Sequence, residues 1–111
     1  MLLRNGKIIG YNIKPLKYPT KIIVNNSDYK FPLNGVYYKL KNKNKYIMLN
    51  CPYKFEICLN TQTYEWDILS AWHGAIFYKS LYNYGIPPEH PNCWISSING
   101  KSLPTITYEF S

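Results

Sequence analysis

The side chains with the widest chemical range in this 111-residue sequence are two histidines and three cysteines. His73 could act as a general acid or base if a substrate came within hydrogen-bond reach. His90 and Cys93 have a His-x-x-Cys spacing, and Cys51, Cys58 and His73 could in principle complete a set of four zinc ligands. Structural zinc sites usually combine two such close pairs, and this sequence has one. We therefore expect no metal and no other cofactor.

A cysteine nucleophile is a second chemistry open to these residues. Cys58 or Cys93 could lie beside His73 in space, but the sequence offers no orienting group and no context that activates a thiol. The odd number of cysteines and the lack of a Cys-x-x-Cys pair also argue against a secreted disulfide scaffold. We expect reduced, mostly buried thiols that pack as small hydrophobic side chains.

Lysines and tyrosines alternate in a short basic stretch, which suggests a third kind of site. Nucleic-acid-binding surfaces use lysines for phosphates and aromatic faces for bases. In an extended backbone, alternate side chains point to one side, so these lysines would form one face. Exposed lysines on a hairpin also keep an edge strand from pairing with other chains, and edge protection is the competing interpretation. The predicted nucleic-acid-binding residues are Lys39, Lys41, Lys43, Lys45, Tyr37 and Tyr46.

The formal net charge of +7 is unevenly distributed along the chain. Residues 1–54 hold eleven Lys/Arg and one acidic residue, whereas residues 55–111 hold two Lys and five acidic residues. Such a cationic end can steer nucleic acids, nucleotides or acidic proteins. Asn, Lys, Ile and Tyr supply 49 of the 111 residues. Their codons are rich in A and T, so a biased genome composition explains the lysine content as well as selection for binding does.

The first half of the chain reads as β-structure. Runs rich in β-branched and aromatic residues alternate with Pro, Asn and Asp, which interrupt strands or form turns. The clearest hairpin joins two such runs through the polar link KNKNK. The expected strands are Lys7–Ile13, Lys21–Asn25, Val36–Leu40, Tyr46–Leu49 and Tyr53–Leu59.

The pattern from residue 63 onward predicts a helix. Thr63 suits an N-cap, Glu65 and Asp67 place negative charge in the first turn, and Gly85 followed by two prolines is a strong stop. Apolar residues recur every three or four positions from Trp66 to Tyr84. We expect a helix over residues 64–84 whose apolar stripe, with Trp72 or His73 on it, faces a sheet.

The end of the chain returns to β-structure. Cys93–Ile98 and Thr105–Phe110 read as strands, and Asn99-Gly100 is a turn typical of tight hairpins. The sequence thus predicts a single α+β domain over residues 1–111, with one main helix packed on an antiparallel or mixed sheet. No apolar run approaches the ~20 residues that span a bilayer, so we expect a soluble intracellular protein without a membrane partner.

Two short segments resemble a family of small proteins from viruses of hyperthermophilic crenarchaea, whose composition is also similar. Leu16–Asn25 is similar to the Leu-x-x-Phe-Pro-Thr segment that enters a strand in that family. The stretch 70–73, with Gly85 beyond it, resembles the family's Ser-Ala-x-Gly-His and the helix that follows. Trp72 and Ile76 stand where the family has glycine and threonine.

The family includes viral ring nucleases, anti-CRISPR proteins that cleave cyclic tetra-adenylate at a homodimer interface without metal. The resemblance implies a catalytic role for His73, as general acid or as the group that orients the attacking 2′-hydroxyl. Lys17 or Lys21 would then hold phosphate charge.

Two functions follow from the sequence. The first is a non-enzymatic viral accessory protein, a homodimer in the host cytoplasm, whose basic face contacts nucleic acid or a host protein. The alternative is a divergent ring nuclease with His73 at its active site. The lack of a phosphate loop, dinucleotide fingerprint, zincin helix or nucleophile elbow favours the first.

Overall fold

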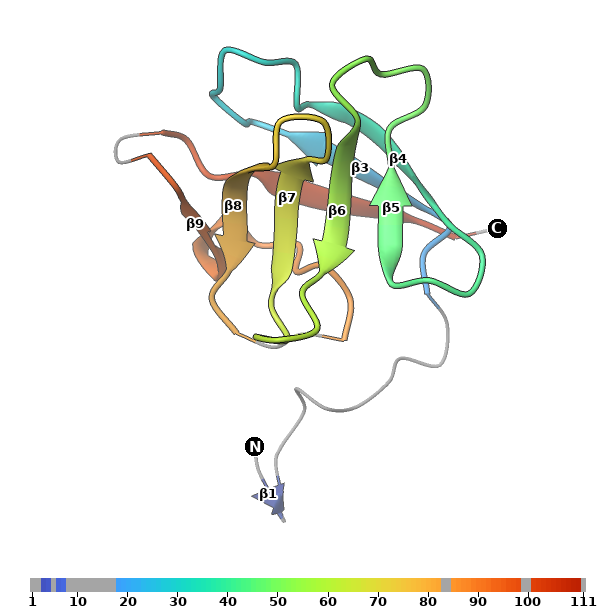
Figure 1. Cartoon of the computed structure of the whole chain (residues 1–111). Helices are drawn as coiled ribbons and strands as arrows, with labels where there is room; N and C mark the ends of the chain where they lie inside the picture. Colours follow the sequence, from blue (N-terminus) through green and yellow to red (C-terminus); the bar gives the residue numbers. More distant parts are fainter. Residues whose placement is uncertain (1–2, 5, 8–17, 83–84, 99–100, 111) are drawn as a thin grey trace.

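The protein is almost entirely β-structure in the parts of the chain that the computed structural model describes, which are residues 3–4, 6–7, 18–82, 85–98 and 101–110. Two short strands near the N-terminus, β1 (Leu3–Arg4) and β2 (Gly6–Lys7), pair with each other. The only helical element in the described residues is a 3-10 turn, η1 (Pro91–Cys93). All other strands belong to one antiparallel sheet (Figure 1).

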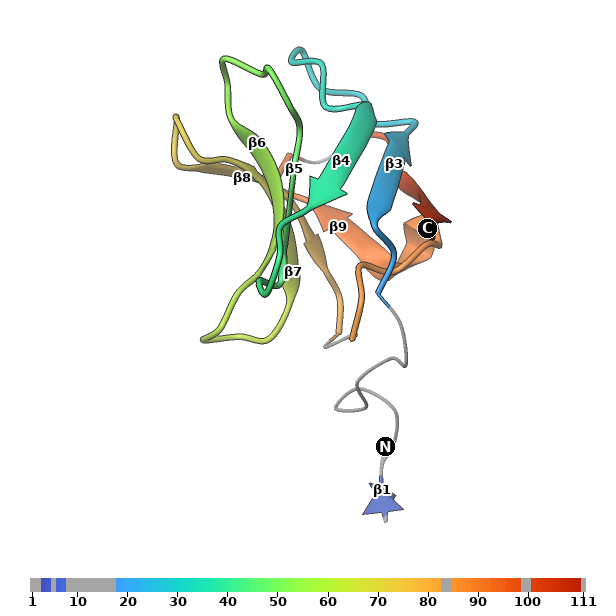
Figure 2. The ribbon, with the colours of Figure 1, turned by 90° about the vertical axis from the view of Figure 1, so that its right-hand side faces the viewer.

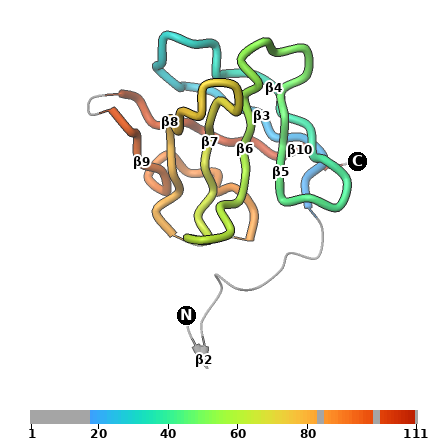
Figure 3. The backbone as a smooth tube through the Cα atoms, viewed as in Figure 1, coloured from blue at the N-terminus to red at the C-terminus, as the bar shows by residue number. Residues whose placement is uncertain are grey.

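This sheet has eight strands in the order β10-β3-β4-β5-β6-β7-β8-β9. From β3 to β9 each strand pairs with the next one along the chain, and β10 returns to the free edge of β3; Figure 3 traces this path. Figure 2 shows that the sheet curls, so that β6 and β7 face β3 and β4 across the core. The strands are β3 (Lys21–Asn25), β4 (Gly35–Lys39), β5 (Lys45–Ile47), β6 (Phe55–Leu59), β7 (Trp66–Ser70), β8 (Ala75–Ser80), β9 (Trp94–Ser96) and β10 (Thr105–Glu109).

A row of four fully buried side chains crosses the middle of the sheet. Tyr46 is the register partner of Ile57, Ile57 of Ile68, and Ile68 of Tyr78, and each is 0% exposed. Because successive residues of a strand point to opposite faces, this row fixes which side of β5 to β8 lines the core.

The segment after β8 covers the gap between the two edge strands. The backbone N–H of Ile106, on β10, donates to the carbonyl of Glu89 at 3.1 Å. The hydroxyl of Tyr108, on the same strand, donates to the carbonyl of Pro87 at 2.6 Å. These bonds tie β10 to the connection that leads into β9, and they occupy polar groups at an edge that is otherwise open to another chain.

The helix predicted over residues 64–84 is wrong, and with it the α+β fold class. Residues 66–70 and 75–80 are the antiparallel strands β7 and β8, joined by the turn 71–74. Of the predicted apolar stripe, Trp66 lies in the core, Leu69 and Ile76 pair on the outer face, and Trp72 is 65% exposed in the turn. The residues of the predicted stripe therefore do not lie on one face.

Local chemistry explains why a turn forms here. Gly74 has φ +70°, a left-handed conformation that costs other residues energy. The Ser70 side chain accepts a hydrogen bond from the His73 backbone N–H at 3.2 Å, which closes the turn. The flanking Ile68, Phe77 and Tyr78 are β-branched or aromatic and favour strands. The apolar residues that suggested a helix thus belong to two short strands separated by a four-residue turn, and their spacing of three and four residues does not come from a helix.

Most of the other predicted strands are confirmed. β3 and β6 coincide with or lie within the predicted runs, and the hairpin around KNKNK forms between β4 and β5. β10 begins directly after Pro104, as predicted, because proline has no backbone N–H to donate to a neighbouring strand. Residues 8–13 and Asn99-Gly100 lie outside the described residues.

The expected hairpin between the last two strands is wrong. β9 pairs with β8, whereas β10 pairs with β3, so the two strands form opposite edges of the sheet. In the described part of the chain, no helix is long and apolar enough to cross a membrane.

The substitution Gly74→Ala distinguishes the turn from the expected helix by the sign of its effect. A Cβ at this position meets no atom within 4 Å, so only the positive φ opposes alanine. We expect the free energy of unfolding to fall by about 1 to 2 kcal/mol. In a helix the same change would stabilise by about 1 kcal/mol. Denaturant unfolding measures the difference, and Gly74→Asn, which tolerates positive φ, should lose less.

Two buried tyrosines predict how stability depends on alkaline pH. Burial raises the pKa of Tyr37 and of Tyr46, whose hydroxyls donate to the carbonyls of Leu33 at 2.7 Å and Pro19 at 2.9 Å. Their stabilising effect is complete below the unfolded tyrosine pKa of about 10 and is lost as pH rises above it. The urea midpoint should therefore fall above about pH 10. Ionisation of every tyrosine with the fold intact would contradict this expectation.

Candidate functional site

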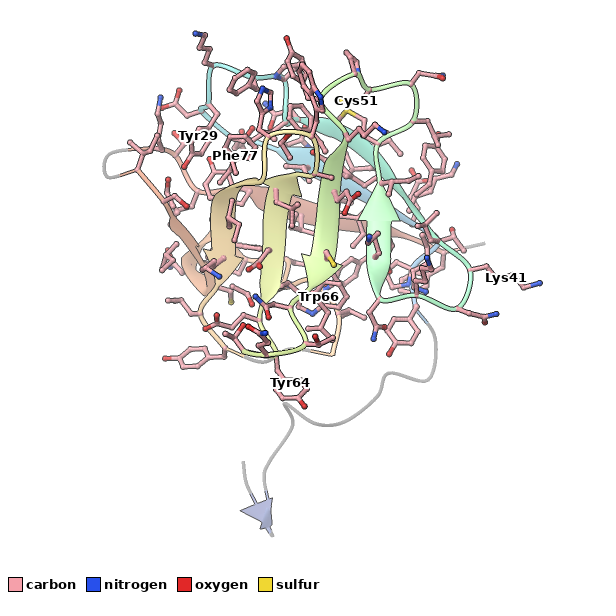
Figure 4. The ribbon with its side chains drawn as sticks, viewed as in Figure 1. Tyr29, Lys41, Cys51, Tyr64, Trp66 and Phe77 are labelled. Carbon is pink, nitrogen blue, oxygen red and sulfur yellow. The ribbon has the colours of Figure 1, made fainter. Side chains whose placement is uncertain are left out.

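The predicted lysines and His73 lie at two opposite ends of the curled sheet. The end that is uppermost in Figure 1, here the upper end, carries the loops 26–34 and 48–54 and the turn 71–74 with His73. The lower end carries the turn between β4 and β5 with the predicted lysines. In Figure 4, Tyr29 and Cys51 mark the upper end, and Lys41 projects away from the sheet at the lower end.

The lysine turn, defined as residues 39–45, reverses the chain instead of extending it. Lys41 and Lys43 are exposed in the turn itself, and Asn42 has φ +61°. The Leu40 backbone N–H donates to the Lys45 carbonyl at 3.0 Å and closes the hairpin. The predicted comb of lysines on one side of an extended strand is therefore wrong, because strand geometry ends at Lys39 and resumes at Lys45.

The four lysines of this turn differ in their contacts. Lys45 Nζ lies 3.3 Å from Glu56 Oε1. Lys39 Nζ donates to the Leu40 carbonyl at 3.1 Å and lies 5.3 Å from the centre of the Tyr18 ring. Lys41 and Lys43 form no ion pair or ring contact within the described residues. These two are the lysines most open to a ligand.

The two tyrosines predicted to accompany the lysines lie in the core. Tyr37 and Tyr46 are both 0% exposed, and their hydroxyls bond to backbone carbonyls. Their rings therefore present no face to solvent. Tyr18 and Tyr38 are the half-buried tyrosines that contact lysines at this end, through Lys39 and Lys21.

Edge protection does not explain the lysine turn. β4 lies between β3 and β5, and β5 lies between β4 and β6, so neither strand has a free edge. The edge strands are β9 and β10, and β3 separates β10 from β4. The competing interpretation from the sequence is therefore wrong, because there is no edge here to protect.

Lysines without an acidic partner gather at the two ends. Three ion pairs join neighbouring strands, Lys21–Glu109 at 3.8 Å, Lys45–Glu56 at 3.3 Å and Lys79–Asp67 at 3.3 Å. Within residues 18–82, 85–98 and 101–110, the lysines outside these pairs are Lys39, Lys41 and Lys43 at the lower end and Lys30, Lys54 and Lys101 at the upper end.

His73 belongs to an aromatic rim at the upper end, defined as Phe31, Tyr53, Trp72 and His73. The His73 ring stacks on Tyr53, with centroids 6.0 Å apart and planes 22° apart, and lies 5.7 Å from Phe31. The Trp72 ring lies 4.7 Å from His73 on the solvent side. Three separate loops supply these four rings, so only the folded sheet brings them together.

Hydrogen bonds around Ser70 orient the imidazole of His73. The Ser70 hydroxyl donates to the Tyr53 carbonyl at 2.6 Å, and its oxygen lies 3.1 Å from His73 Nδ1. Since the hydroxyl has one proton, already donated, Nδ1 must be the donor to Ser70 Oγ. This assignment leaves Nε2 as the unprotonated nitrogen of neutral His73. Ser70 is 0% exposed, and its hydroxyl joins the turn to Tyr53 through these hydrogen bonds.

Of the two lysines that the resemblance places with a catalytic His73, the described residues include only Lys21, and it does not lie beside the histidine. Lys21 lies at the lower end, 3.8 Å from Glu109, and Lys17 lies outside the described residues. The segment that resembles the viral family's histidine stretch forms a turn instead of leading into a helix. A catalytic role for His73 stays a prediction.

The remaining chemical candidates have structural explanations. His90 caps η1, where its Nδ1 accepts a hydrogen bond from the Asn92 backbone N–H at 3.1 Å. All three cysteines are free and half-buried, less buried than expected, and burial raises the pKa of the Cys58 thiol. The described residues contain no group of three or more His, Cys, Asp or Glu side chains that could hold a metal ion.

Most of the aromatic rim was missed in the sequence. Phe31, Tyr53 and Lys54 lie in loops of ordinary composition, and no short spacing connects them to residues 72 and 73. The sequence does contain one indication of the rim, because consecutive hairpins place every second connection at the same end of a sheet. Using it requires the correct strands, and the predicted helix hid two of them.

Comparison of the chain with protein-family models, curated proteins and solved structures finds no match. Function is therefore inferred from the two ends of the sheet. The viral origin, the homodimer and the host cytoplasm stay predictions.

Ser70→Ala tests whether this hydroxyl holds the turn that presents His73. The change removes the donor to the Tyr53 carbonyl and the acceptor for the His73 backbone N–H. We expect a loss of about 1 to 3 kcal/mol in the free energy of unfolding, measured with urea. Ser102→Ala, at an exposed serine that bonds to Tyr78 through its backbone carbonyl, should change it by less than about 0.5 kcal/mol. Equal effects of the two substitutions would refute this role of Ser70.

Proposed function

We propose that the protein is a non-enzymatic nucleic-acid-binding protein that contacts phosphates through its lysine turn. The observation that carries the proposal is a set of three lysines, Lys39, Lys41 and Lys43, at an exposed turn between two internal strands. None of them has an acidic partner among the residues that the structure describes. Lysines at such a turn can approach a phosphate backbone without moving the sheet.

The local charges support this proposal. The nearest acidic residues with known contacts, Glu56 and Glu109, are already paired with Lys45 and Lys21. Each pair is close to neutral, and the three unpaired lysines outnumber Glu65, whose loop also lies at this end, so the net charge of the unpaired groups is positive. A positive turn attracts the phosphates of DNA or RNA and releases the counterions condensed on them.

The ring-nuclease alternative gains no comparable support. The resemblance requires Lys17 or Lys21 beside His73; Lys21 lies at the other end of the sheet, and Lys17 lies outside the described residues. Binding through the lysine turn needs neither residue. A host protein with an acidic surface would use the same charges, and it is a possible outcome of the test below.

The double substitution Lys41→Gln/Lys43→Gln should weaken binding in a salt-dependent way. Each lost phosphate contact lowers the slope of log affinity against log salt by about 0.9 for duplex DNA and about 0.7 for a single strand. We expect the slope to fall by about 1.4 to 1.8 between ~50 and ~200 mM salt. Fluorescence anisotropy of a labelled oligonucleotide measures both slopes.

The matched control is Lys21→Gln/Lys45→Gln, which removes the same formal charge from lysines that are already ion-paired. Its slope should change less than that of the first variant. Equal slopes for the two variants would show a net-charge effect without contact at the lysine turn. No binding of DNA or RNA at low salt, with binding of an acidic protein instead, would rule out the proposed function.

A further inference from the structure

We infer that the aromatic rim is a second binding site, which stacks an unpaired nucleobase of a single-stranded nucleic acid and holds the adjoining phosphates with nearby lysines. The ligand class rests on the proposed function. The residues do not, because the rim and the lysine turn lie at opposite ends of the sheet.

The first support is the exposure of Trp72. Its side chain is 65% exposed, whereas Trp66 and Trp94 are 0% and 1% exposed. An indole in water is the kind of apolar surface that marks binding sites when it belongs to a cluster. Here the cluster consists of the Trp72 and His73 rings, which lie together in one turn.

The second support is a stack of rings that runs from the core to solvent. Phe55 is 1% exposed, Tyr53 stacks on it with centroids 5.4 Å apart and planes 13° apart, and His73 stacks on Tyr53. The outer rings are therefore held in place by contacts with the core. A base that stacks on Trp72 or His73 meets a surface that is already ordered, which lowers the entropic cost of binding.

The third support is the charge around the rim. Lys30 precedes Phe31 and Lys54 follows Tyr53, and both lysines are exposed. Lys101 Nζ donates to the Asp28 carbonyl at 3.0 Å, and Asp28 is the only acidic residue in the described loops at this end. Exposed aromatic faces between lysines are the pattern with which proteins bind single strands, by base stacking and phosphate attraction.

The surface beside the rim is also hollowed. An open pocket of about 620 Å³ lies on the loop 48–54 and its flanking strands. Lys54, Phe55 and Glu56 are among the residues that line it, and the four rim residues are not. Its size falls in the range of small-ligand pockets, about 300 to 1,000 Å³. Lys54 borders both the pocket and the turn, since its carbonyl accepts the Ala71 backbone N–H at 2.9 Å.

The experiment uses the tryptophan fluorescence of the full chain. All three tryptophans lie in the described residues and two are buried, so a quenching ligand reports on Trp72. A single-stranded oligonucleotide of about five nucleotides, close to the smallest site size of single-strand binders, should quench this fluorescence. A duplex of the same sequence, whose bases are already stacked, should not. A mononucleotide should bind more weakly than the oligonucleotide.

Anisotropy of the labelled oligonucleotide then compares three variants that are first shown to melt as the wild type does. Trp72→Ala should weaken binding about tenfold, the effect of losing one stacked base. Trp72→Phe should restore most of it. The control Tyr64→Asn alters a tyrosine that is 56% exposed at the lower end, where Figure 4 shows it, and asparagine tolerates its φ of +59°. This control should bind as the wild type does.

Failure of the rim and failure of the proposed function are distinguishable. If Trp72→Ala binds like wild type while Lys41→Gln/Lys43→Gln binds more weakly, the rim inference is wrong and the proposed function stands. If no oligonucleotide binds at low salt, both are wrong. Equal affinity for a mononucleotide and the oligonucleotide, or equal quenching by an acidic peptide, would also overturn stacking of a single strand at the rim.

Discussion

The hydrogen-bond register of β5 to β8 is the constraint on which the rest of the structure depends. It aligns Tyr46, Ile57, Ile68 and Tyr78 in one buried row, and the core forms around that row. A shift of one residue in any of these pairs would turn a strand's core side chains toward solvent. The same register fixes where each connection emerges, because antiparallel neighbours alternate in direction.

This alternation sorts the chemistry of the chain into two ends. Connections that follow β3, β5 and β7 reach the upper end, where Phe31, Tyr53 and His73 come into contact. The connection that follows β4 reaches the lower end and carries Lys41 and Lys43. Phe31, Tyr53 and His73, each about 20 positions from the next in sequence, thus share the upper surface. Tyr38, which is nearer to Tyr53 in sequence, lies at the lower end. The aromatic rim forms at the upper end, and the densest run of lysines lies at the lower end.

Much of the strand content was predictable, because β-branched runs between turn residues are a local signal. Lys21–Asn25 was predicted with the bounds that the structure has. The helix was not avoidable by spacing alone, because Trp66, Leu69, Ile76 and Ser80 keep a helical spacing although they lie on both faces of two strands joined by a four-residue turn. The positive φ of Gly74 and the Ser70 hydrogen bonds decide the outcome. The rim depends on pairing between strands, which no local pattern encodes, and so it could not be read from the sequence.

The central claim is that nucleic acid contacts the two ends of the curled sheet. Amide chemical shifts of the labelled protein, followed during titration with a single-stranded oligonucleotide, test it most directly. The account predicts that shifts concentrate at residues 39–45 and at residues 30–31, 53–54 and 72–73, with little change at 61–65 beside β7. Shifts confined to residues outside these two groups, or no shift at low salt, would contradict it.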